Sequence, residues 1–423
     1  MDTRTISIRY GDQEREARVP EKNMLDEVGM RHTEPAADPV NLIERALDSP
    51  VGAPRIEEAA RGMQRVVILV DDLTRPTPVH LILPSVLERF RLAGVPEAAI
   101  TVMVATGTHR GMSGPELEQK LGPDVVTRYR VVNHDYTKEE EQTDLGSTPS
   151  GIPITVDRLV AEADYVLAVG NIVPHRYCGW SGGAKMIQPG VGGEATTAGT
   201  HLMITKDPGA RLGVVENQVR HEMETVAERA NLKFIVNTVL DRYANLVYIA
   251  AGDFREAFRQ GVKQAREVYS APLRGQADIV LASAYPSDIN FWQAGKALYS
   301  ADLAVRDGGI IILASPCYEG VGEHGAFADL LSYDYPTIDG MVQRNEVPDR
   351  IGAAGALAVA LVRARADIWL VTDNVTPEEA ARMSVRRFTD LQEAVDLALA
   401  QRGHEAKLTV LHEATEILPI LSE

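Results

Sequence analysis

The chain has few of the residues that would cross-link it or hold it in a membrane. It contains two cysteines in 423 residues, Cys178 and Cys317, which are too few for a disulfide framework and do not form a CxxC pair. The sequence has no run of about 18 apolar residues, so it predicts no membrane span. Its first residues also lack the apolar centre of a signal peptide. We therefore expect a cytoplasmic protein.

Positive charge is also scarce. Lys and Arg together number 43, against 60 Asp and Glu, which gives a formal net charge of −17. Nucleic acids and anionic membranes bind to broad basic faces, so this balance argues against both as partners. A small anionic substrate remains compatible with it, because a few Arg and Lys side chains can dominate one pocket.

Length and composition predict more than one globular domain. The chain is 45% hydrophobic, as globular proteins are, and it is longer than a single core usually serves. We find no internal repeat and no low-complexity tract. A break around residues 270–275 divides the chain into an N-terminal domain, residues 1–272, and a C-terminal domain, residues 273–423.

The hydrophobic pattern predicts α/β architecture. Alternating apolar residues on either side of Gly11 indicate a β-hairpin within the first 20 residues. Short continuous apolar runs separated by helical segments are typical of parallel strands covered by helices on both faces. The strands expected after the hairpin are 65–71, 100–105, 129–133, 165–170, 234–240, 279–282, 310–314, 369–372 and 408–411. Helices are expected between many of them, for example 253–269 and 391–401, and Pro84 should kink a helix or mark its start. We expect two α/β domains with mainly parallel sheets and an active site in the cleft between them.

Polar residues gather in four loops that each follow a predicted strand, where ligands of open α/β sheets bind. In the loop 71–78, Asp72 is suited to a ligand hydroxyl and Arg75 to a carboxylate or phosphate. It is equally compatible that Asp72 or Thr74 caps the next helix while Arg75 pairs with the carboxylates. The loop 105–110 places His109 at the end of a strand, where a structural hydrogen bond is the commoner role.

The third loop, residues 170–201, is long and the richest in functional side chains. Its glycines let a ligand approach the backbone and offer N–H groups to anions. It is neither a Walker A sequence nor a dinucleotide fingerprint, because the required Gly-Lys-Ser/Thr and strand-turn-helix context are missing. A simple connector is a poor fit to such a loop. Its candidate residues are His175, Ser181, Gly182, Gly183, Lys185 and His201.

Two further segments contain candidates in the second half of the chain. In the loop 287–296, Gln293 and Lys296 are three residues apart and share one face at the start of a helix. Lys296 is suited to bind a carboxylate, although a solvated lysine is equally compatible. A weaker cluster joins Cys317, Glu323 and His324, whose side chains are of metal-binding types. Their spacing matches no zinc template, so a loop-capping role is favoured.

The motifs taken together resemble the nickel-dependent lactate racemase family. They occur here in the order and spacing of that family, and the resemblance extends over nearly the whole chain. The matching strings are Asp-Asp-Leu-Thr-Arg-Pro-Thr-Pro (71–78), Ala-Thr-Gly-Thr-His-Arg (105–110), Val-Pro-His-Arg (173–176), Ser-Gly-Gly-Ala-Lys (181–185) and Gly-Thr-His (199–201).

This resemblance implies a racemase or epimerase of a 2-hydroxycarboxylic acid, which would be a small anionic substrate. It implies a nickel-pincer nucleotide, pyridinium-3,5-bisthiocarboxylic acid mononucleotide nickel, joined covalently to Lys185 through a thioamide. It also implies that His201 ligates the nickel in a near-square plane with soft donors. Proteins of cofactor biosynthesis are then expected partners.

The resemblance also implies roles for the remaining candidates. His109 and His175 would form an acid/base pair, since an imidazole pKa of about 6.5 lets either ring give or take a hydroxyl proton while hydride leaves and returns to C2. Residues expected at the cofactor are Asp72, Arg75, Ser181, Gly182 and Gly183. Residues expected at the substrate are Arg75, Gln293 and Lys296.

Two other functions stay open. One is a nicotinamide-dependent 2-hydroxyacid dehydrogenase, against which the missing Gly-x-Gly-x-x-Gly unit argues. The other is a non-catalytic protein that binds or inserts the cofactor, against which the presence of both His109 and His175 argues. The substrate is also open among lactate, malate, aromatic, longer aliphatic and sugar acids.

Overall fold

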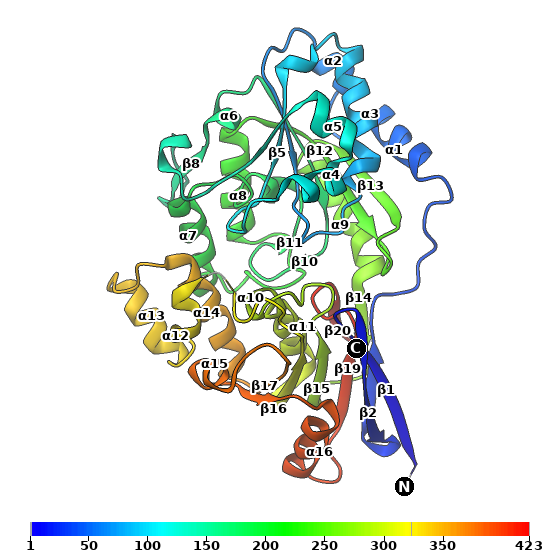
Figure 1. Ribbon diagram of the computed structural model, residues 1–423, viewed down its shortest axis with the longest axis vertical. Helices are drawn as coiled ribbons and strands as arrows, with labels where there is room; N and C mark the ends of the chain where they lie inside the picture. Colours follow the sequence, from blue (N-terminus) through cyan, green and yellow to red (C-terminus); the bar gives the residue numbers. More distant parts are fainter. Residues whose placement is uncertain (1, 323, 423) are drawn as a thin grey trace. The chain divides into compact units, whose positions relative to one another are not determined.

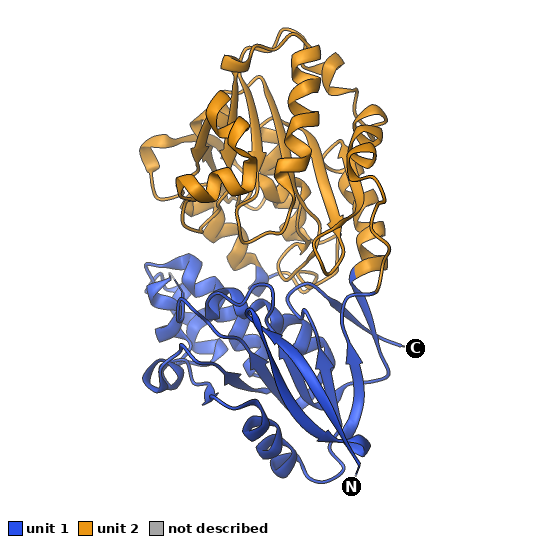
Figure 2. Cartoon of the chain, turned by 45° about the vertical axis from the view of Figure 1, so that its right-hand side comes forward, with its two compact units in different colours: residues 1–31, 204–206, 269–423 blue, residues 32–203, 207–268 orange. Residues whose placement is uncertain are grey.

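The computed structural model describes residues 2–322 and 324–422, which form two compact units (Figure 2). Unit 1 comprises Met1–Arg31, Ile204–Lys206 and Tyr269–Glu423, and unit 2 comprises His32–Met203 and Asp207–Val268. Each unit contains one six-stranded sheet and its own helices. The expected α/β class with mainly parallel sheets is confirmed.

The units differ from the expected domains, 1–272 and 273–423, at the N-terminus. Residues 1–31 belong to unit 1, together with the C-terminal part of the chain. The reason is pairing and burial, because the strand β3 (Met24–Val28) is parallel to β19 (Leu408–Leu411). The hairpin before it also buries Ile6 and Ile8 in the core of unit 1.

The sheet of unit 2 has the strand order β13-β12-β9-β4-β5-β6, and Figure 1 labels its strands β5, β12 and β13. All neighbouring strands are parallel except β13, which is antiparallel to β12 at the edge. The strands are β4 (Val66–Val70), β5 (Ile100–Val104), β6 (Arg130–Asn133), β9 (Tyr165–Asn171), β12 (Leu232–Leu240) and β13 (Leu246–Gly252). The chain runs outward from β4 through β5 and β6, and then resumes on the other side at β9.

Burial explains why these segments are strands. Every residue of β4 is buried, and Val66, Ile68 and Val70 share one hydrophobic cluster. Val67 and Leu69 point to the opposite face, where they are also buried. A strand covered on both faces reads as the continuous apolar run that parallel sheets require.

Helices cover the sheet of unit 2. The helix α3 begins at Val79 and contains Pro84 in its interior, so the expectation that Pro84 marks the helix start is wrong. The buried side chains of this helix pack in the same cluster as those of β4. The helices are α1 (Pro39–Asp48), α2 (Ile56–Ala59), α3 (Val79–Leu92), α4 (Gly114–Leu121), α5 (Pro123–Arg128), α6 (Arg158–Ala161), α7 (Glu194–Leu202), α8 (Gln218–Arg229) and α9 (Glu256–Tyr269).

The sheet of unit 1 has the order β18-β17-β16-β15-β19-β3, and all its described pairings are parallel. The strands that follow β15 along the chain, β16 to β18, lie on one side of it in the sheet, whereas β19 and β3 lie on its other side. Its strands are β3, β19, β15 (Ala277–Ser283), β16 (Val305–Ala314), β17 (Asp367–Val371) and β18 (Arg386–Phe388). The expected strands of both units are confirmed within a few residues at their ends.

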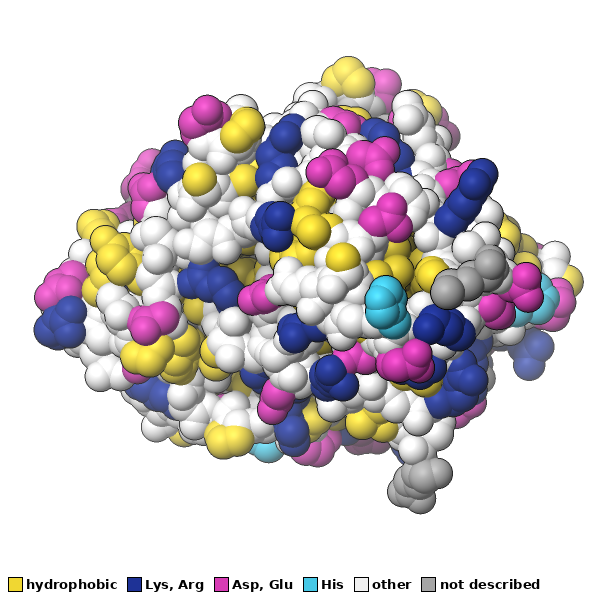
Figure 3. Space-filling model, turned by 90° about the horizontal axis from the view of Figure 1, so that it is seen from below, with side chains coloured by type: hydrophobic (Ala, Val, Ile, Leu, Met, Phe, Trp, Pro, Cys, Tyr) yellow, Lys and Arg dark blue, Asp and Glu magenta, His cyan; other side chains and the backbone are white. Residues whose placement is uncertain are grey.

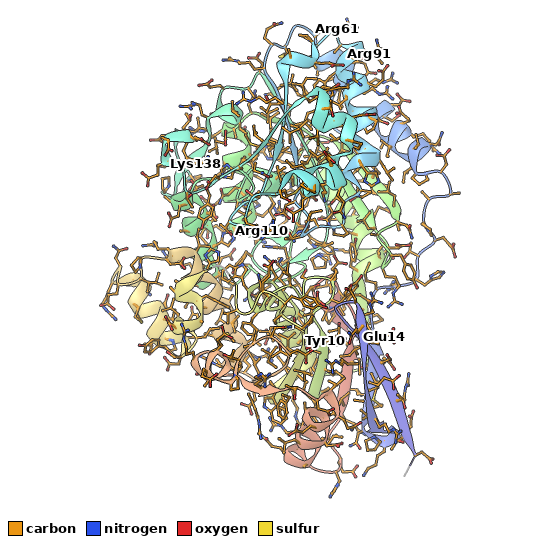
Figure 4. The ribbon with its side chains drawn as sticks, in the orientation of Figure 1. Tyr10, Glu14, Arg61, Arg91, Arg110 and Lys138 are labelled. Atoms are coloured by element: carbon orange, nitrogen blue, oxygen red, sulfur yellow. The ribbon has the colours of Figure 1, made fainter. Side chains whose placement is uncertain are left out.

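One face of the unit 1 sheet is covered by the N-terminal hairpin and by α16. The hairpin consists of β1 (Thr3–Tyr10) and β2 (Gln13–Pro20), with Gly11 at the turn as expected; Tyr10 and Glu14 mark its two strands in Figure 4. Its apolar side chains share a cluster with Ile279 and Ile310 of the sheet. The helices of unit 1 are α10 (Phe291–Ala294), α11 (Lys296–Ala304), α12 (Gly325–Leu330), α13 (Tyr335–Gln343), α14 (Arg350–Arg363), α15 (Pro377–Arg382) and α16 (Leu391–Arg402).

The remaining strands form small two-stranded sheets that the apolar pattern did not predict. They are antiparallel in β7–β8 and β10–β11 and parallel in β14–β20. Their bounds are β7 (Gln142–Ser147), β8 (Pro153–Asp157), β10 (Pro174–His175), β11 (Gly179–Trp180), β14 (Ser270–Leu273) and β20 (Leu418–Leu421).

Charges of both signs are dispersed over the surface. On the face shown in Figure 3, Lys and Arg side chains alternate with Asp and Glu, so neither sign forms a continuous field over the described residues there. None of the helices in residues 2–322 and 324–422 has the length and apolarity needed to cross a bilayer.

Truncation of a hairpin side chain should destabilise unit 1. Ile8 is 1% exposed and packs in the core of that unit, so Ile8→Ala should cost about 2–5 kcal/mol of unfolding free energy. Urea denaturation followed by circular dichroism measures the loss. The exposed Glu16 of the same hairpin provides the control, since Glu16→Ala should change stability by less than about 0.5 kcal/mol. Equal midpoints for the two variants would show that the hairpin is not part of the core.

Candidate active site

Three loops of unit 2 begin at the same level of its sheet. Val70 at the end of β4 lies opposite Val169 of β9 and Val104 of β5. The segments that begin at residues 71, 105 and 171 therefore leave the same edge of the sheet. β4 and β9 are also the strands between which the chain changes direction, where open α/β sheets bind their ligands.

The first two of these loops are joined by a pair between Asp72 and His109. Oδ2 of Asp72 lies 2.7 Å from Nδ1 of His109. Oδ1 of the same carboxylate accepts hydrogen bonds from the backbone N–H of Thr74 at 2.9 Å and from its hydroxyl at 2.5 Å. Asp72 thus closes a turn within its own loop and holds a histidine. The interpretation that it caps the next helix is wrong, because α3 begins after Pro78 without a side-chain cap.

The surroundings of Asp72 keep it ionised. Burial favours its protonated form, but the charge and hydrogen bond of His109, together with the charge of Arg75, outweigh burial and hold the pKa of the Asp72 carboxyl well below its usual range. A carboxylate only accepts hydrogen bonds, so Nδ1 of His109 carries hydrogen. In the neutral ring the lone pair is then on Nε2.

The backbone at Arg75 is held by Lys120, a residue that was not among the candidates predicted from the sequence. Lys120 of α4 is buried, and its Nζ donates to the Arg75 carbonyl at 2.7 Å and pairs with Asp71 at 2.9 Å. Asp71 also accepts the Thr77 hydroxyl at 2.5 Å. The Arg75 guanidinium donates to the carbonyl and hydroxyl of Thr74, at 3.0 Å each. The Asp71–Lys120 pair therefore positions the loop that presents Asp72 and Arg75.

The residue after His109 connects the second loop to the next helix. Arg110, labelled in Figure 4, pairs with Glu116 near the start of α4 at 2.8 Å. Glu116 also closes a capping box with Ser113. The histidine is thus presented by a segment tied at both sides, to Asp72 and to α4.

His175 lies at the start of the third loop, in β10, and has a different environment. Its Nδ1 accepts the backbone N–H of Tyr177 at 3.3 Å, and the sulfur of Cys178 is also 3.3 Å away. The Cys178 thiol donates to the Trp180 carbonyl. Because Nδ1 accepts a hydrogen bond, the neutral ring of His175 carries its hydrogen on Nε2, opposite to His109.

The ring of Tyr177 connects His175 to His201. Its centroid lies 5.5 Å from that of His175 and 4.7 Å from that of His201. His201 is in α7, where its Nδ1 is 2.9 Å from the carbonyl oxygen of Thr197, one turn earlier. Nδ1 therefore donates, and the lone pair of the neutral His201 ring is on Nε2, the nitrogen that a metal would take.

The glycine-rich turn before Lys185 is shaped by buried polar groups. Gly182 has φ +78°, and a Cβ there would lie 2.7 Å from Oδ1 of Asn237, so a larger residue does not fit. Oδ1 of Asn237 accepts the N–H of Gly183 at 2.7 Å. The Ser181 hydroxyl donates to the Asn171 carbonyl and accepts the N–H of Val173. Ser181, Gly182 and Gly183 thus build the turn.

Lys185 is partly buried in the 3₁₀ helix Gly183–Met186, and its amine connects the two halves of the site. Burial, aided by the charges of Arg75 and Arg220, lowers the pKa of Lys185 to about 8. The Asp72 and Cys178 side chains act on it in the opposite direction. The amine therefore lies within the electrostatic field of Asp72, which holds His109, and of Cys178, which contacts His175.

Two buried amides near this turn have an unsatisfied donor. Within the described residues, Nδ2 of Asn171 and Nδ2 of Asn237 have no hydrogen-bond partner. They occupy neighbouring strands, β9 and β12, near their carboxyl ends. A polar residue within a buried apolar run is the signal in the sequence that could have identified them.

Gln293 and Lys296 lie in unit 1, in the segment that follows β15. Asn290 caps α10 by accepting the N–H of Gln293 at 2.9 Å. The Lys296 ammonium donates to the side-chain oxygen of Gln293, so the expectation that these two side chains share one face is confirmed. The loop follows β15, the strand from which the order of strands in the sheet of unit 1 runs outward to both sides.

The weaker cluster does not form a metal site within the described residues. No group of three or more His, Cys, Asp or Glu side chains suited to a metal occurs there, and Glu323 lies outside the described residues. His324 precedes α12 and lies 3.7 Å from Asp349. Burial raises the pKa of the Cys317 thiol to about 11, so Cys317 stays protonated.

Comparisons with known proteins match the chain over most of its length. A family model described as the lactate racemase N-terminal domain matches residues 10–213, and one described as the lactate racemase C-terminal domain matches residues 274–418. The lactate racemase of Lactiplantibacillus plantarum is 32% identical over 89% of this chain and 90% of its own length. That of Thermoanaerobacterium thermosaccharolyticum is 31% identical over 98% of each chain.

Solved structures give the same result. The lactate racemase apoprotein from T. thermosaccharolyticum superposes with a TM-score of 0.89 at 30% identity and covers 99% of this chain and all of its own. A protein from Thermotoga maritima superposes with a TM-score of 0.72 at 20% identity over 92% of this chain. The latter likeness concerns the fold alone.

Removal of the Lys120 charge should destabilise unit 2. Lys120→Met leaves the Asp71 carboxylate buried without its cation, which should cost about 3–5 kcal/mol in urea denaturation. A second change tests this cause, because Asp71→Asn in the Lys120→Met background removes the stranded charge. The double variant should recover part of the loss. If the double variant loses as much unfolding free energy as Lys120→Met and Asp71→Asn lose together when each is made alone, the two residues do not act as a pair.

Proposed function

Because the chain belongs to the lactate racemase family, we propose that it interconverts the two enantiomers of lactate or of a closely related 2-hydroxycarboxylic acid. One observation in unit 2 carries the proposal. The Lys185 amine is acted on both by Asp72, the partner of His109, and by Cys178, the neighbour of His175. An amine of lowered pKa, influenced by a neighbour of each histidine, fits a racemase that uses a covalently held cofactor.

The residues present fit the nickel-pincer nucleotide in three respects. The lowered pKa of Lys185 makes its amine available for a covalent bond near neutral pH. The hydrogen bond from His201 to Thr197 directs the Nε2 lone pair to a metal, as in other metal-binding histidines. The unsatisfied amides of Asn171 and Asn237 can donate to a polar group. In this proposal Lys185 tethers the cofactor, His201 ligates nickel, and Asp72, Arg75 and the turn 181–183 lie along it.

The bound cofactor would supply an acceptor for the hydride of C2, so that the substrate becomes a planar 2-keto acid that can be reduced on either face. The rest of the reaction concerns the hydroxyl proton. The C2 hydrogen is too weakly acidic to leave as a proton, so hydride loss requires a base at the hydroxyl group. Two enantiomers bound by the same carboxylate direct their hydroxyls differently, which calls for two bases.

His109 and His175 serve as this acid/base pair, with the first resting as the base and the second as the acid. Nε2 of His109 holds a lone pair and can accept the hydroxyl proton of one enantiomer, while Asp72 fixes the ring and balances the charge that develops. Nε2 of His175 carries hydrogen and can donate it to the alkoxide that forms on reduction from the other face. Each group of this kind accelerates a reaction by about 10²–10⁴-fold.

The substrate carboxylate requires cationic and polar partners. Arg75 has the planar donor set that pairs with carboxylates, and it lies in the loop of Asp72. Lys296 and Gln293 of unit 1 form a hydrogen-bonded pair that presents an ammonium and an amide. We assign these three residues to carboxylate binding.

The test is racemisation of a panel of 2-hydroxyacids by the holoenzyme, followed by chiral chromatography without added nicotinamide. Wild type should convert each enantiomer of its substrate to the racemate. His109→Ala and His175→Ala should each lower turnover by at least about 10²-fold. Because the enantiomers have equal free energies, kcat/KM should fall by the same factor in both directions.

The control is His404→Ala, which removes an exposed imidazole of unit 1 and should leave turnover unchanged. Normal turnover in a variant of either active-site histidine would remove that residue from the mechanism. Formation of NADH from a 2-hydroxyacid and added NAD, without racemisation, would instead identify a dehydrogenase.

The two cofactor residues should separate tethering from metal binding. Lys185→Ala should lose the added mass of the organic cofactor in intact-protein mass spectrometry, whereas the exposed Lys263→Ala should keep it. His201→Ala should retain that mass but lose nickel, measured by ICP-MS on the same sample. Wild-type nickel content in His201→Ala would reject the ligand role.

A further inference from the structure

Arg220 of α8 is a fully buried arginine directed at the glycine-rich turn of unit 2. Its side chain has no solvent exposure. The guanidinium donates to the carbonyls of Gly182 at 3.2 Å and Cys178 at 3.4 Å, and also to that of Trp180. Its other contact is the ring of Phe258, whose centroid is 4.2 Å away. One side chain thus holds three carbonyls along the segment that leads into Lys185.

The charge of Arg220 is not neutralised by a carboxylate. Among the residues that the structure describes, no Asp or Glu lies within 4.0 Å of its guanidinium nitrogens. The acidic side chains of the same helix are used elsewhere, since Glu222 accepts from Ser150 and Glu224 pairs with Arg259. Burial of an unpaired charge is costly and is rarely kept for packing alone.

We propose that Arg220 prepares Lys185 for covalent attachment of the cofactor, by fixing the turn that carries the lysine and by placing an unpaired positive charge beside its amine. This role rests on the proposed tether at Lys185. Arg220 is a positioning residue in this scheme, since its contacts are with the backbone of the turn and with Phe258. Nothing in the sequence distinguishes it from an arginine on a solvated helix face.

The groups that act on the Lys185 amine come from every side of the turn. Arg220 of α8 and Arg75 of the first loop favour the neutral amine, whereas Asp72 and Cys178 favour the ammonium. The strands β9 and β12, which also pack on this turn, contribute the neutral amides Asn171 and Asn237 near it. The positive charges together with burial prevail, and the pKa of Lys185 falls to about 8.

A neutral amine is what the attachment step requires. The lone pair of Nζ attacks the carbon of a thiocarboxylic acid, a carbon–nitrogen bond forms, and a carbon–oxygen bond breaks. One amine proton and the proton of the thiocarboxylic acid leave with that oxygen as water, and the thioamide keeps the sulfur and the second amine hydrogen. No oxidant or reductant takes part. Since an ammonium has no lone pair, the rate of this step rises with the neutral fraction of Lys185.

The experiment measures the reactivity of Lys185 in the full-length apoprotein, without substrate or cofactor. Competitive acetylation with acetic anhydride from pH 6 to pH 11, followed by peptide mass spectrometry, gives the midpoint pH of Lys185 relative to free N-acetyl-lysine amide in the same tube. Wild type should have its midpoint near pH 8. Arg220→Gln should raise this midpoint by roughly a few tenths of a pH unit, because one of the nearby positive charges is lost.

Two further variants separate charge from structure. Arg220→Lys keeps the positive charge and should keep the low midpoint, even where it lowers thermal stability. Arg266→Gln is the matched control, because Arg266 also donates to a backbone carbonyl of this region, that of Gly213, and lies 5.5 Å from the Trp180 ring. It should leave the midpoint of Lys185 unchanged.

Several results would overturn the proposal. They are a wild-type midpoint equal to that of the free lysine amide, an unchanged midpoint in folded Arg220→Gln, and a raised midpoint in folded Arg220→Lys. The first and the third decide the matter even where Arg220→Gln does not fold. The labelling uses no substrate, so a chain that passes this test and fails to racemise hydroxyacids would refute the proposed function and leave the role of Arg220 intact.

Discussion

The site in unit 2 depends on the adjacency of β4 and β9. The two strands are parallel neighbours, yet the chain between them forms β5 and β6 on one side of the sheet before returning. Their carboxyl ends therefore face the same edge, and the loops that follow diverge over opposite halves of the sheet. This leaves room at one edge for a short loop with Asp72 and a long loop with Lys185. Both strands are buried throughout, so the level at which these loops begin is set by the packing of the core.

Both loops need support, because they leave backbone carbonyls without strand or helix partners, and the one with Lys185 is also rich in glycine. In unit 2, each of these two loops is supported by a buried cationic side chain from a helix. Lys120 of α4 holds the carbonyl of Arg75, and Arg220 of α8 holds carbonyls on both sides of Ser181. The two differ in charge balance, since Asp71 neutralises Lys120 whereas Arg220 contacts carbonyls and an aromatic face, and no carboxylate, among the described residues. The unbalanced cation is the one that lowers the pKa of Lys185. In the proposed scheme, the electrostatic cost of its burial therefore accompanies a gain in the reactivity of that lysine.

The strands were predictable from the sequence, because a parallel strand buried on both faces must be apolar throughout. The main loops were predictable in turn, because each begins directly after such a strand. His109 and Lys185 could be found in this way. The supporting residues could not, since Lys120 and Arg220 each stand in a helix where a charged residue reads as solvated, and only the tertiary structure shows them buried. The placement of residues 1–31 in unit 1 was equally hidden, because β3 pairs with β19 across nearly the whole chain. Of the two alternatives for Pro84, the helix start is wrong for a local reason, as α3 begins five residues before it.

The two histidines raise a question of symmetry. A racemase treats mirror-image substrates, but His109 is held by a carboxylate at Nδ1 and His175 by a backbone N–H and a thiol. At rest the first ring presents an acceptor at Nε2 and the second a donor. In the proposed mechanism the protein is therefore set for one enantiomer and must exchange protons before it accepts the other. Because the enantiomers are equal in free energy, this asymmetry cannot change the ratio of the two kcat/KM values. It can appear only in the separate constants, as a kcat that differs between the two enantiomers and a KM that differs by the same factor. An acid/base pair with unlike partners is therefore compatible with a reaction whose equilibrium is symmetric.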